Sequence, residues 1–165
     1  MSEVLHGLAP VLSRQTRLVV LGSFPGGKSL ALQRYYAHPQ NQFWKILSAL
    51  WQADLIDMAY DARCDELRQR GLGVWDVYAA CEREGSLDTA IRNAQPNDLS
   101  VLLRECPEVQ AVAHNGGESF RHARHTLALG LAVHRLPSTS PANASWSFER
   151  KLAAWRDVFT LYGLA

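Results

Sequence analysis

The 165-residue sequence has few cysteines and no long apolar run. Its three cysteines, Cys64, Cys81 and Cys106, are scattered, which argues against an iron–sulfur cluster and favours free thiols in a reducing compartment. No apolar run approaches the ~20 residues of a membrane-spanning helix. Residues 1–14 lack the basic start and clean apolar core of a secretion signal. We therefore expect a cytoplasmic protein that does not associate with membranes.

The sequence also lacks a charge imbalance, because 17 basic residues face 16 acidic ones and the formal net charge is +1. This balance neither supports nor excludes DNA binding, since a groove needs only a local set of basic residues. Residues 121–125 form one such cluster, which is either a DNA contact or a solvated helix face. The six histidines show no paired metal-ligand spacing, so we expect no metal and no other cofactor.

The length and a hydrophobic content of 47% predict a single domain over residues 1–165. Short apolar segments predict four strands, at residues 17–22, 71–76, 109–114 and 131–136. Helical patterns alternate with them, at residues 41–53, 55–70, 97–106 and 118–129, and in a last helix that Ser145 could cap. The charged segment 82–94 is expected to be an excursion over the surface. This order predicts an α/β fold, a three-layer αβα arrangement around a four-stranded, mostly parallel sheet.

In a parallel sheet, ligands bind at the carboxyl ends of the strands. The segments that follow the four predicted strands are rich in turn-forming and polar residues: Gly22–Ser29, Trp75–Tyr78, Asn115–Gly117 and Ser138–Asn143. They should therefore converge on one edge of the sheet, and we expect a functional site there.

The first of these segments, GSFPGGKS from Gly22 to Ser29, matches the phosphate-binding loop pattern G-x-x-x-x-G-K-[ST]. Such a loop surrounds an anion with backbone N–H groups at a helix N-terminus. Against this interpretation, the helix that would follow stops before Pro39, and no later strand ends convincingly in a metal-binding Asp. A phosphate-loop kinase remains one alternative.

A longer pattern includes the same segment. Gly22–Gly26 followed by Tyr35–Trp44 (YYAHPQNQFW), together with Leu136–Ala142 (LPSTSPA), resembles the two motifs of the uracil-DNA glycosylase superfamily. Between them, Gly71–Ile91 resembles the DNA-deoxyinosine (hypoxanthine-DNA) glycosylase branch. The resemblance covers nearly the whole chain. It implies a monomeric DNA glycosylase of base excision repair that removes a deaminated base, with hypoxanthine first and uracil or xanthine as secondary substrates.

Hydrolysis of an N-glycosidic bond passes through an oxocarbenium-like sugar that a well-placed water can capture. Many members of the superfamily hold this water with Asp or Asn at the third residue of the first motif, where this chain has Phe24. The resemblance then implies that Asn41 holds the water. An N-cap of a helix starting at Gln42 is the alternative for Asn41, and both roles can coexist. If neither residue supports catalysis, the chain is an inactive module that binds damaged DNA.

The resemblance also implies how the base is held. Phe43 would stack on the flipped base, unless it packs in the core. The backbone of Gly22, Ser23 and Phe24 would contact the base. Asp76 could accept the N1–H of hypoxanthine, unless it caps the following turn.

Further residues fall on the same edge. Asn115 and Ser138 are expected in the pocket, and Lys28 and Ser140 at DNA phosphates. Ala142 occupies the position at which relatives carry a leucine-like wedge, and it is too small for that task. Asn143 or a neighbouring loop residue would then substitute, and Pro141, Ala142 and Asn143 are all expected to contact DNA. Lys28 is the one lysine in these loops, so no Schiff-base nucleophile is evident and the enzyme would be monofunctional.

Overall fold

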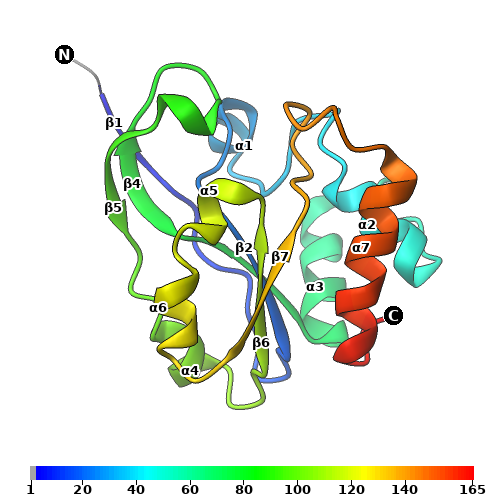
Figure 1. The fold of residues 1–165 in the computed structure, drawn as a ribbon. Coiled ribbons are helices and arrows are strands. Elements are labelled where there is room, and N and C mark those ends of the chain that lie inside the picture. The colour runs from blue at the N-terminus through cyan, green and yellow to red at the C-terminus, as the bar shows by residue number, and fades with distance from the viewer. Residues whose placement is uncertain (1–2) are drawn as a thin grey trace.

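The computed structural model describes residues 3–165 and has a four-stranded parallel sheet at its centre (Figure 1). The strands lie in the order β3-β2-β6-β7. Their bounds are β2 Leu18–Gly22, β3 Leu72–Asp76, β6 Ala111–Asn115 and β7 Ala132–Leu136. All three pairings are parallel. The predicted α/β fold and the four predicted strands are thus confirmed, with each strand starting one or two residues later than expected.

The residues of the central strands face two separate cores. In β2, Leu18 and Val20 belong to one hydrophobic cluster, and Val19 and Leu21 belong to the other. All four side chains are fully buried. Since successive strand residues point to opposite faces, a strand without a polar position needs cover on both sides. This is why the sequence shows β2 as a continuous apolar run.

Helices cover both faces (Figure 1). On one side lie α2, α3 and α7, which supply most of the first core. On the other lie α4, α5 and α6. The helix bounds are α1 Gly27–Leu32, α2 Phe43–Trp51, α3 Tyr60–Arg70, α4 Val101–Glu105, α5 Gly117–Phe120, α6 Ala123–Leu127 and α7 Phe148–Leu161.

The single helix expected at residues 118–129 is instead the pair α5 and α6, which pack around a buried histidine. The two ring nitrogens of His114 lie 2.8 Å from the Ser119 hydroxyl and 2.9 Å from the Thr126 hydroxyl. Ser119 also donates to the Leu21 carbonyl oxygen at 2.8 Å. Burial lowers the pKa of His114 to about 4, so this ring is neutral at pH 7.

Segment 82–94 is more ordered than the expected surface excursion. Strands β1 (Val4–His6), β4 (Tyr78–Glu82) and β5 (Arg92–Pro96) form a second, antiparallel sheet in the order β1-β4-β5. The chain between β4 and β5 is an exposed loop with one 3-10 turn, Asp88–Ala90. In β4, register shifts around Ala80 break the regular alternation of side chains between the two faces of the sheet. The sequence pattern of this segment therefore does not indicate a strand.

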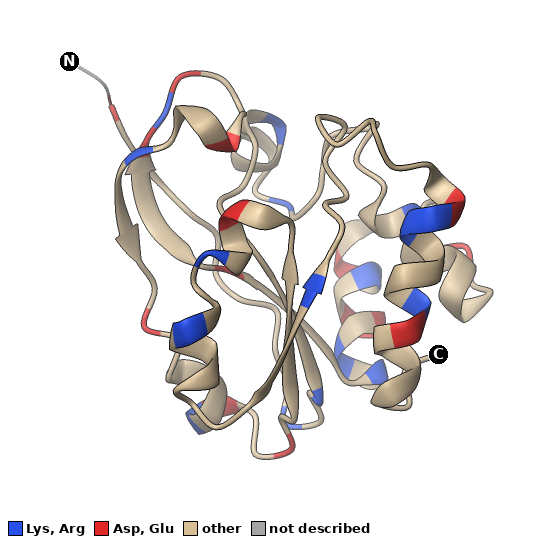
Figure 2. Cartoon of the chain, viewed as in Figure 1, with Lys and Arg blue, Asp and Glu red and all other residues tan. Residues whose placement is uncertain are grey.

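No helix within residues 3–165 is long and apolar enough to cross a membrane. Lys and Arg residues are spread over several elements, among them α3, α6 and α7 (Figure 2). The described chain contains four ion pairs, and three of them join residues three or four positions apart.

The cap of α7 is Ser147 and not Ser145 as expected. The Ser147 hydroxyl accepts a hydrogen bond from the Arg150 backbone N–H at 3.2 Å. The Ser145 hydroxyl instead lies 3.4 Å from Asn143 Oδ1. Replacing Ser147 by Ala should lower the free energy of unfolding by about 1 kcal/mol, because it leaves a helix N–H unpaired. Urea unfolding measures this loss, and Ser145→Ala is the matched control. A larger loss in the control would contradict the assignment.

Candidate active site

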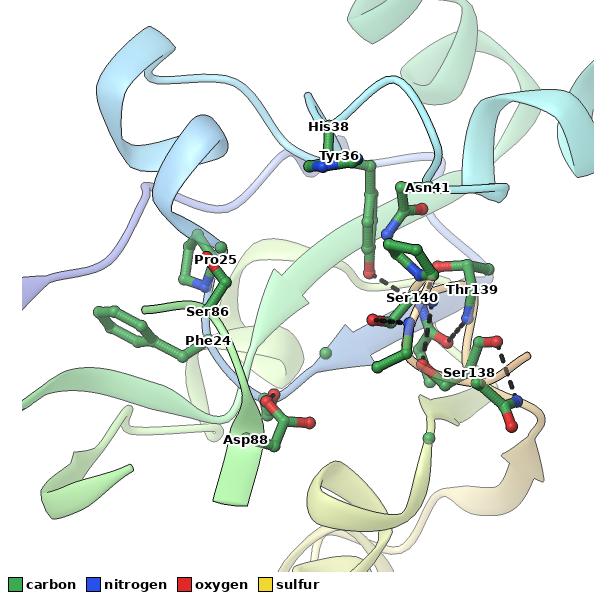
Figure 3. Close-up of a pocket in the computed structure, with 18 of the residues that line it drawn as sticks. Phe24, Pro25, Tyr36, His38, Asn41, Ser86, Asp88, Ser138, Thr139 and Ser140 are labelled. Carbon is green, nitrogen blue, oxygen red and sulfur yellow. Dashed lines mark hydrogen bonds between the residues drawn. The ribbon is translucent and has the colours of Figure 1, made fainter. Parts of the chain in front are cut away.

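The carboxyl ends of the four parallel strands open on a cavity of about 1110 Å³. Its walls come from the turn after β2, the segment before α2, the β4–β5 loop and the segment after β7 (Figure 3). Most predicted site residues line it: Gly22, Ser23, Phe24, Lys28, Asn41, Asp76, Asn115, Ser138, Ser140, Pro141, Ala142 and Asn143. Phe43 is the predicted site residue that does not. The topology explains this convergence, because parallel strands end at one edge.

The turn after β2 lies directly against the Asp76 side chain. Gly22 and Asp76 are register partners at the ends of β2 and β3. A methyl group on Gly22 would lie 2.5 Å from Asp76 Oδ1 and 3.3 Å from the Tyr36 hydroxyl oxygen. Only glycine therefore leaves room for the carboxyl and the phenol at this point.

Gly22→Ala should therefore displace the Asp76 carboxyl and destabilise the fold by about 1–3 kcal/mol, the usual cost of overpacking. Urea unfolding gives the loss. Gly26→Ala is the folding control, because a methyl group there meets Ser86 only at an ordinary 3.7 Å. Equal stability of the two variants would show that the Asp76 side chain moves aside freely.

The backbone N–H groups of Ser23 and Phe24 take part in none of the hydrogen bonds within residues 3–165. The carbonyl oxygens of this turn are occupied, since Gly22 accepts from the Val77 N–H at 2.9 Å and Ser23 from the Tyr78 N–H at 3.1 Å. The turn is thus fixed through its acceptors while two donors remain at the cavity. The phenyl ring of Phe24 is buried and points away from the polar residues of the site (Figure 3).

Asp76 has a buried carboxyl group, and one of its oxygens has no hydrogen-bond partner. Its side chain is 5% exposed, and Oδ2 is buried without a hydrogen bond. Burial, and next the charge of Asp88, raises its pKa to about 7, and the Arg83 guanidinium opposes this. The expected alternative, a cap of the following turn, is not realised, because no backbone N–H within residues 3–165 donates to this carboxyl.

Asn41 stands on the opposite wall, just before α2. Its Oδ1 accepts the backbone N–H of Phe43, the first residue of α2, at 3.0 Å. The helix begins one residue later than expected, with Gln42 and not Asn41 at the N-cap position, and Asn41 forms a local side-chain turn that satisfies the first N–H of the helix. The other end of the amide faces the cavity (Figure 3). The hydrogen bond from Phe43 fixes the side chain, and that side chain can still bind a water molecule.

Phe43 lies in the core and is fully buried. Tyr36 lies between it and the cavity, with its ring stacked on Phe43 at 4.1 Å between centroids and 26° between planes. The Tyr36 hydroxyl accepts from Asn115 Nδ2 at 3.2 Å. The structure thus places a tyrosine where the sequence suggested a phenylalanine. The doublet Tyr35-Tyr36 was within the recognised motif, but its spacing did not show which ring faces the site.

The segment after β7 is held by Asn115 and Thr139. Thr139 is buried, donates its N–H to Asn115 Oδ1 at 3.1 Å and accepts from Asn115 Nδ2 at 3.0 Å. Its carbonyl oxygen accepts the Gln42 N–H at 3.0 Å, which ties the two motif segments together. Ser138 Oγ accepts the Ser140 N–H at 3.1 Å and keeps its own O–H for a ligand. Thr139 has no signal in the sequence beyond its place in the second motif.

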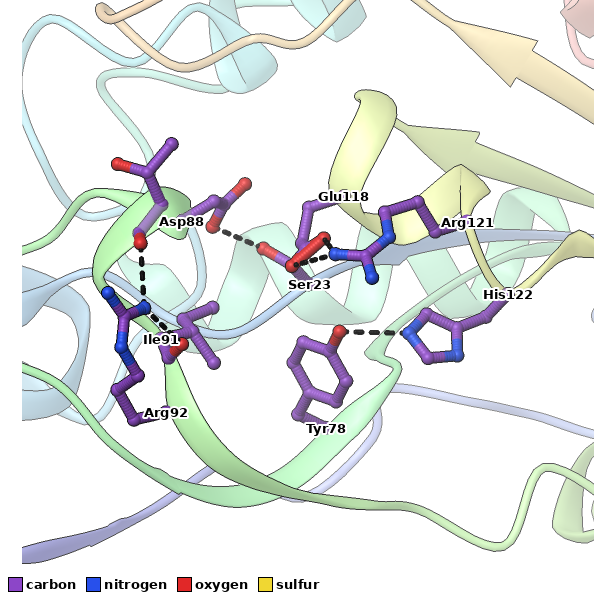
Figure 4. Close-up of polar contacts among 9 residues, drawn as sticks. Ser23, Tyr78, Asp88, Ile91, Arg92, Glu118, Arg121 and His122 are labelled. Atoms are coloured by element: carbon purple, nitrogen blue, oxygen red, sulfur yellow. Dashed lines mark hydrogen bonds and ion pairs between the residues drawn. The ribbon is translucent and has the colours of Figure 1, made fainter.

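The β4–β5 loop is the wall that sequence reasoning missed. Ser86, Leu87, Asp88 and Thr89 line the cavity. The Ser23 hydroxyl donates to Asp88 Oδ1 at 2.6 Å (Figure 4). The only sequence signal was that the branch-specific resemblance extended as far as Ile91. Long-range folding of this loop over the site could not be read from local pattern.

Arg83 anchors this loop from behind. It is 8% exposed, donates to the Pro25 carbonyl oxygen at 2.8 Å and to the Gly85 carbonyl oxygen at 2.8 Å. Its guanidinium also lies 5.3 Å from the centre of the Phe24 ring. One side chain therefore joins the turn after β2 to the β4–β5 loop.

In a phosphate-binding loop, the Gly27 N–H and the Ser29 hydroxyl would bind phosphate and metal. Here the Gly27 N–H donates to Ser86 Oγ at 2.9 Å, and the buried Ser29 hydroxyl accepts the Ala37 N–H at 3.1 Å. These contacts disfavour the kinase alternative. No group of three or more potential metal ligands occurs within residues 3–165.

The basic cluster at residues 121–125 does not line the cavity. Arg121 pairs with Glu118 at 2.8 Å, and the His122 ring nitrogen lies 2.8 Å from the Tyr78 hydroxyl (Figure 4). These partners indicate that the cluster at residues 121–125 is a solvated helix face and not a DNA contact.

Comparisons with known proteins show the family to which this chain belongs. The family model of the uracil DNA glycosylase superfamily matches residues 9–159. A hypoxanthine DNA glycosylase of Methanosarcina barkeri is 34% identical over 93% of this chain and 97% of its own length. A hypoxanthine DNA glycosylase of Methanosarcina acetivorans is 33% identical over 94% of this chain and 98% of its own.

A solution NMR structure of a candidate uracil DNA glycosylase from Methanosarcina acetivorans superposes with a TM-score of 0.88. It is 32% identical in sequence, and the match covers 98% of this chain and 99% of that one. Both motif segments and the strands that present them lie inside the matched region. With sequence family, relatives and fold in agreement, the chain belongs to the uracil DNA glycosylase superfamily.

Proposed function

We propose that this protein is a monofunctional DNA glycosylase of base excision repair that removes hypoxanthine, with uracil and xanthine as secondary substrates. The observation that carries the choice of base is the buried, unpaired carboxyl of Asp76 in the cavity. The names of the two Methanosarcina relatives support the same choice. The cavity volume of about 1110 Å³ is sufficient for a nucleotide rotated out of the duplex.

Asn41 positions the attacking water. The bond between its Oδ1 and the Phe43 N–H fixes the side chain at the start of α2. An amide cannot take up a proton at neutral pH, so its contribution is orientation of the water toward C1′. The oxocarbenium-like sugar is electrophilic enough that a strong base is unnecessary.

The departing base gains negative charge, and donors at the cavity wall stabilise it. The free N–H groups of Ser23 and Phe24 supply two such donors, held by a turn whose acceptors are already bonded. The Ser138 hydroxyl supplies a third. Tyr36, stacked on Phe43, offers the ring against which a base can stack.

Asp76 selects the base through the groups that lie on either side of the ring N–H of that base. Hypoxanthine carries N1–H between C6=O and C2–H. An ionised carboxylate can accept N1–H with one oxygen while the other faces C2–H. Uracil and xanthine carry the corresponding N–H between two carbonyls, so the second carboxylate oxygen would face a carbonyl oxygen. Adenine has a lone pair at N1 and cannot donate from that position. The carboxylate therefore favours hypoxanthine.

The DNA backbone would follow the cavity rim. Exposed Lys28 lies on one side and the segment Ser140–Asn143 on the other, where Ser140 contacts a phosphate. Lys28 is the lysine among the lining residues, and its place at the rim suits a phosphate contact better than attack on C1′. We further propose that the protein acts as a monomer. We also propose that it works in the cytoplasm, and its three buried free thiols fit that reducing compartment.

The test is strand scission after alkali, with end-labelled duplexes that carry one deoxyinosine, deoxyuridine or deoxyxanthosine. We expect fastest cleavage at deoxyinosine. Cleavage only at deoxyuridine would retain the family and reject the proposed base. Binding without scission would indicate an inactive damaged-DNA-binding module.

A further inference from the structure

Removing a nucleotide from a duplex leaves a gap in the base stack, which proteins that deform DNA commonly fill with an apolar side chain. Ala142 stands where a wedge was expected, and it is exposed at the rim of the cavity. Its single methyl group cannot span a base step. If the protein acts on duplex DNA, another apolar side chain at this rim is needed.

Leu87 meets this requirement. Seven large hydrophobic side chains within residues 3–165 are exposed, and Leu87 is the one among them that lines the cavity. It is 58% exposed. Leu127 on α6 is equally exposed but lies outside the cavity. Isolated exposed leucines are ordinary on protein surfaces. Leu87 differs from the others in its position at the cavity.

The residues on both sides of Leu87 are fixed to the turn after β2. Ser86 Oγ accepts the Gly27 N–H at 2.9 Å, and Asp88 Oδ1 accepts the Ser23 O–H at 2.6 Å. Figure 3 shows Ser86 and Asp88 on the side of the cavity opposite Ser138, Thr139 and Ser140. Because the loop is already held in place, Leu87 can meet DNA with little further loss of conformational entropy.

We propose that Leu87 is the wedge that enters the duplex at the step from which the nucleotide leaves. The proposal rests on the proposed glycosylase function. Leu87 would act from the β4–β5 loop, across the cavity from Ala142. It touches DNA bases and takes no part in bond cleavage. Its contribution is therefore confined to duplex substrate, because a single strand has no stack to refill.

The experiment compares single-turnover cleavage of one deoxyinosine in a duplex and in the same strand alone. We expect Leu87→Ala to slow duplex cleavage by about tenfold or more, as expected from loss of the apolar contact of one leucine, with single-strand cleavage nearly unchanged. Leu87→Met should restore the duplex rate. Leu127→Ala, the same change at the same exposure, should alter neither rate.

A second readout is the fluorescence of 2-aminopurine placed beside the deoxyinosine, which should rise when wild type unstacks the step and rise less with Leu87→Ala. Equal duplex rates for wild type and Leu87→Ala would overturn the wedge. A parallel loss on both substrates would also overturn it, since the loop would then only support the cavity. If wild type cleaves neither substrate, the glycosylase function itself fails, which is a separate result.

Discussion

Asn41→Ala should reduce cleavage at deoxyinosine by about 100-fold or more, the order of effect expected when a reacting group loses its position. The reason is that Asn41 is the residue in the segment before α2 whose side-chain amide lines the cavity. Its hydrogen bond from the Phe43 N–H also holds that amide in place. Single-turnover cleavage of a labelled duplex measures the change.

The same substitution also removes the hydrogen bond that the Phe43 N–H donates, which by itself costs about 1 kcal/mol of stability. Two further variants separate the effects. Asn41→Ser can still accept the Phe43 N–H but is too short to hold the same water, so we expect a stable and nearly inactive protein. Asn41→Asp keeps both contacts and should remain active. Full activity of the serine variant would restrict Asn41 to capping.

Asp76→Asn should change which base is removed. The carboxamide accepts the base N–H with its oxygen and donates from its nitrogen to a neighbouring carbonyl, which suits uracil and xanthine. We expect the ratio of deoxyinosine to deoxyuridine cleavage to fall about tenfold or more, since one mismatched polar contact corresponds to about 1–3 kcal/mol. Competition between the two substrates in one reaction measures the ratio. An unchanged ratio would remove Asp76 from base selection.

Asp76 also predicts a dependence on pH. Its folded-state pKa is raised from 3.8 to about 7, so the native state retains a proton that the unfolded state has lost. Stability contributed by this group is present below pH ~4 and is lost as pH rises through about 7. At 1.36 kcal/mol per pKa unit, the loss is about 4 kcal/mol as an upper bound.

Asp76→Asn should therefore be more stable than wild type at pH 8, and this advantage should shrink toward pH 4. Urea unfolding at the two pH values measures it, with Asp157→Asn on the exposed face of α7 as the control. For wild type, deoxyinosine cleavage should rise as Asp76 ionises near pH 7, and Asp76→Asn should lack that rise. A constant stability difference across this range would show that the carboxyl is not desolvated.

The sequence alone was sufficient for the central sheet. β2 is an uninterrupted apolar run because both of its faces are buried. Strands and helices alternate along the chain, and this order fixes a parallel arrangement. The segments after β2, β3, β6 and β7 were expected to meet for the same reason, and they do.

Two features were decided by tertiary contacts. Whether Tyr36 or Phe43 faces the cavity depends on two contacts between distant segments, that of Phe43 with Trp155 and that of Tyr36 with Asn115. The cap of α7 moved to Ser147, since the preceding loop binds back on itself through Ser138 and Asn143. Neither choice has a local signal, because both alternatives satisfy the same pattern.

The β4–β5 loop is the largest difference between expectation and structure. Most of its residues are polar or charged and exposed, the composition of a surface excursion. Their contacts with Ser23, Pro25 and Gly27 cross about 60 positions of sequence. The sequence by itself thus determined the family, the sheet and the edge at which the site forms, because these depend on local periodicity and on short motifs. The tertiary structure decided which side chains close the cavity, because that depends on pairings between distant segments that leave no periodic signal.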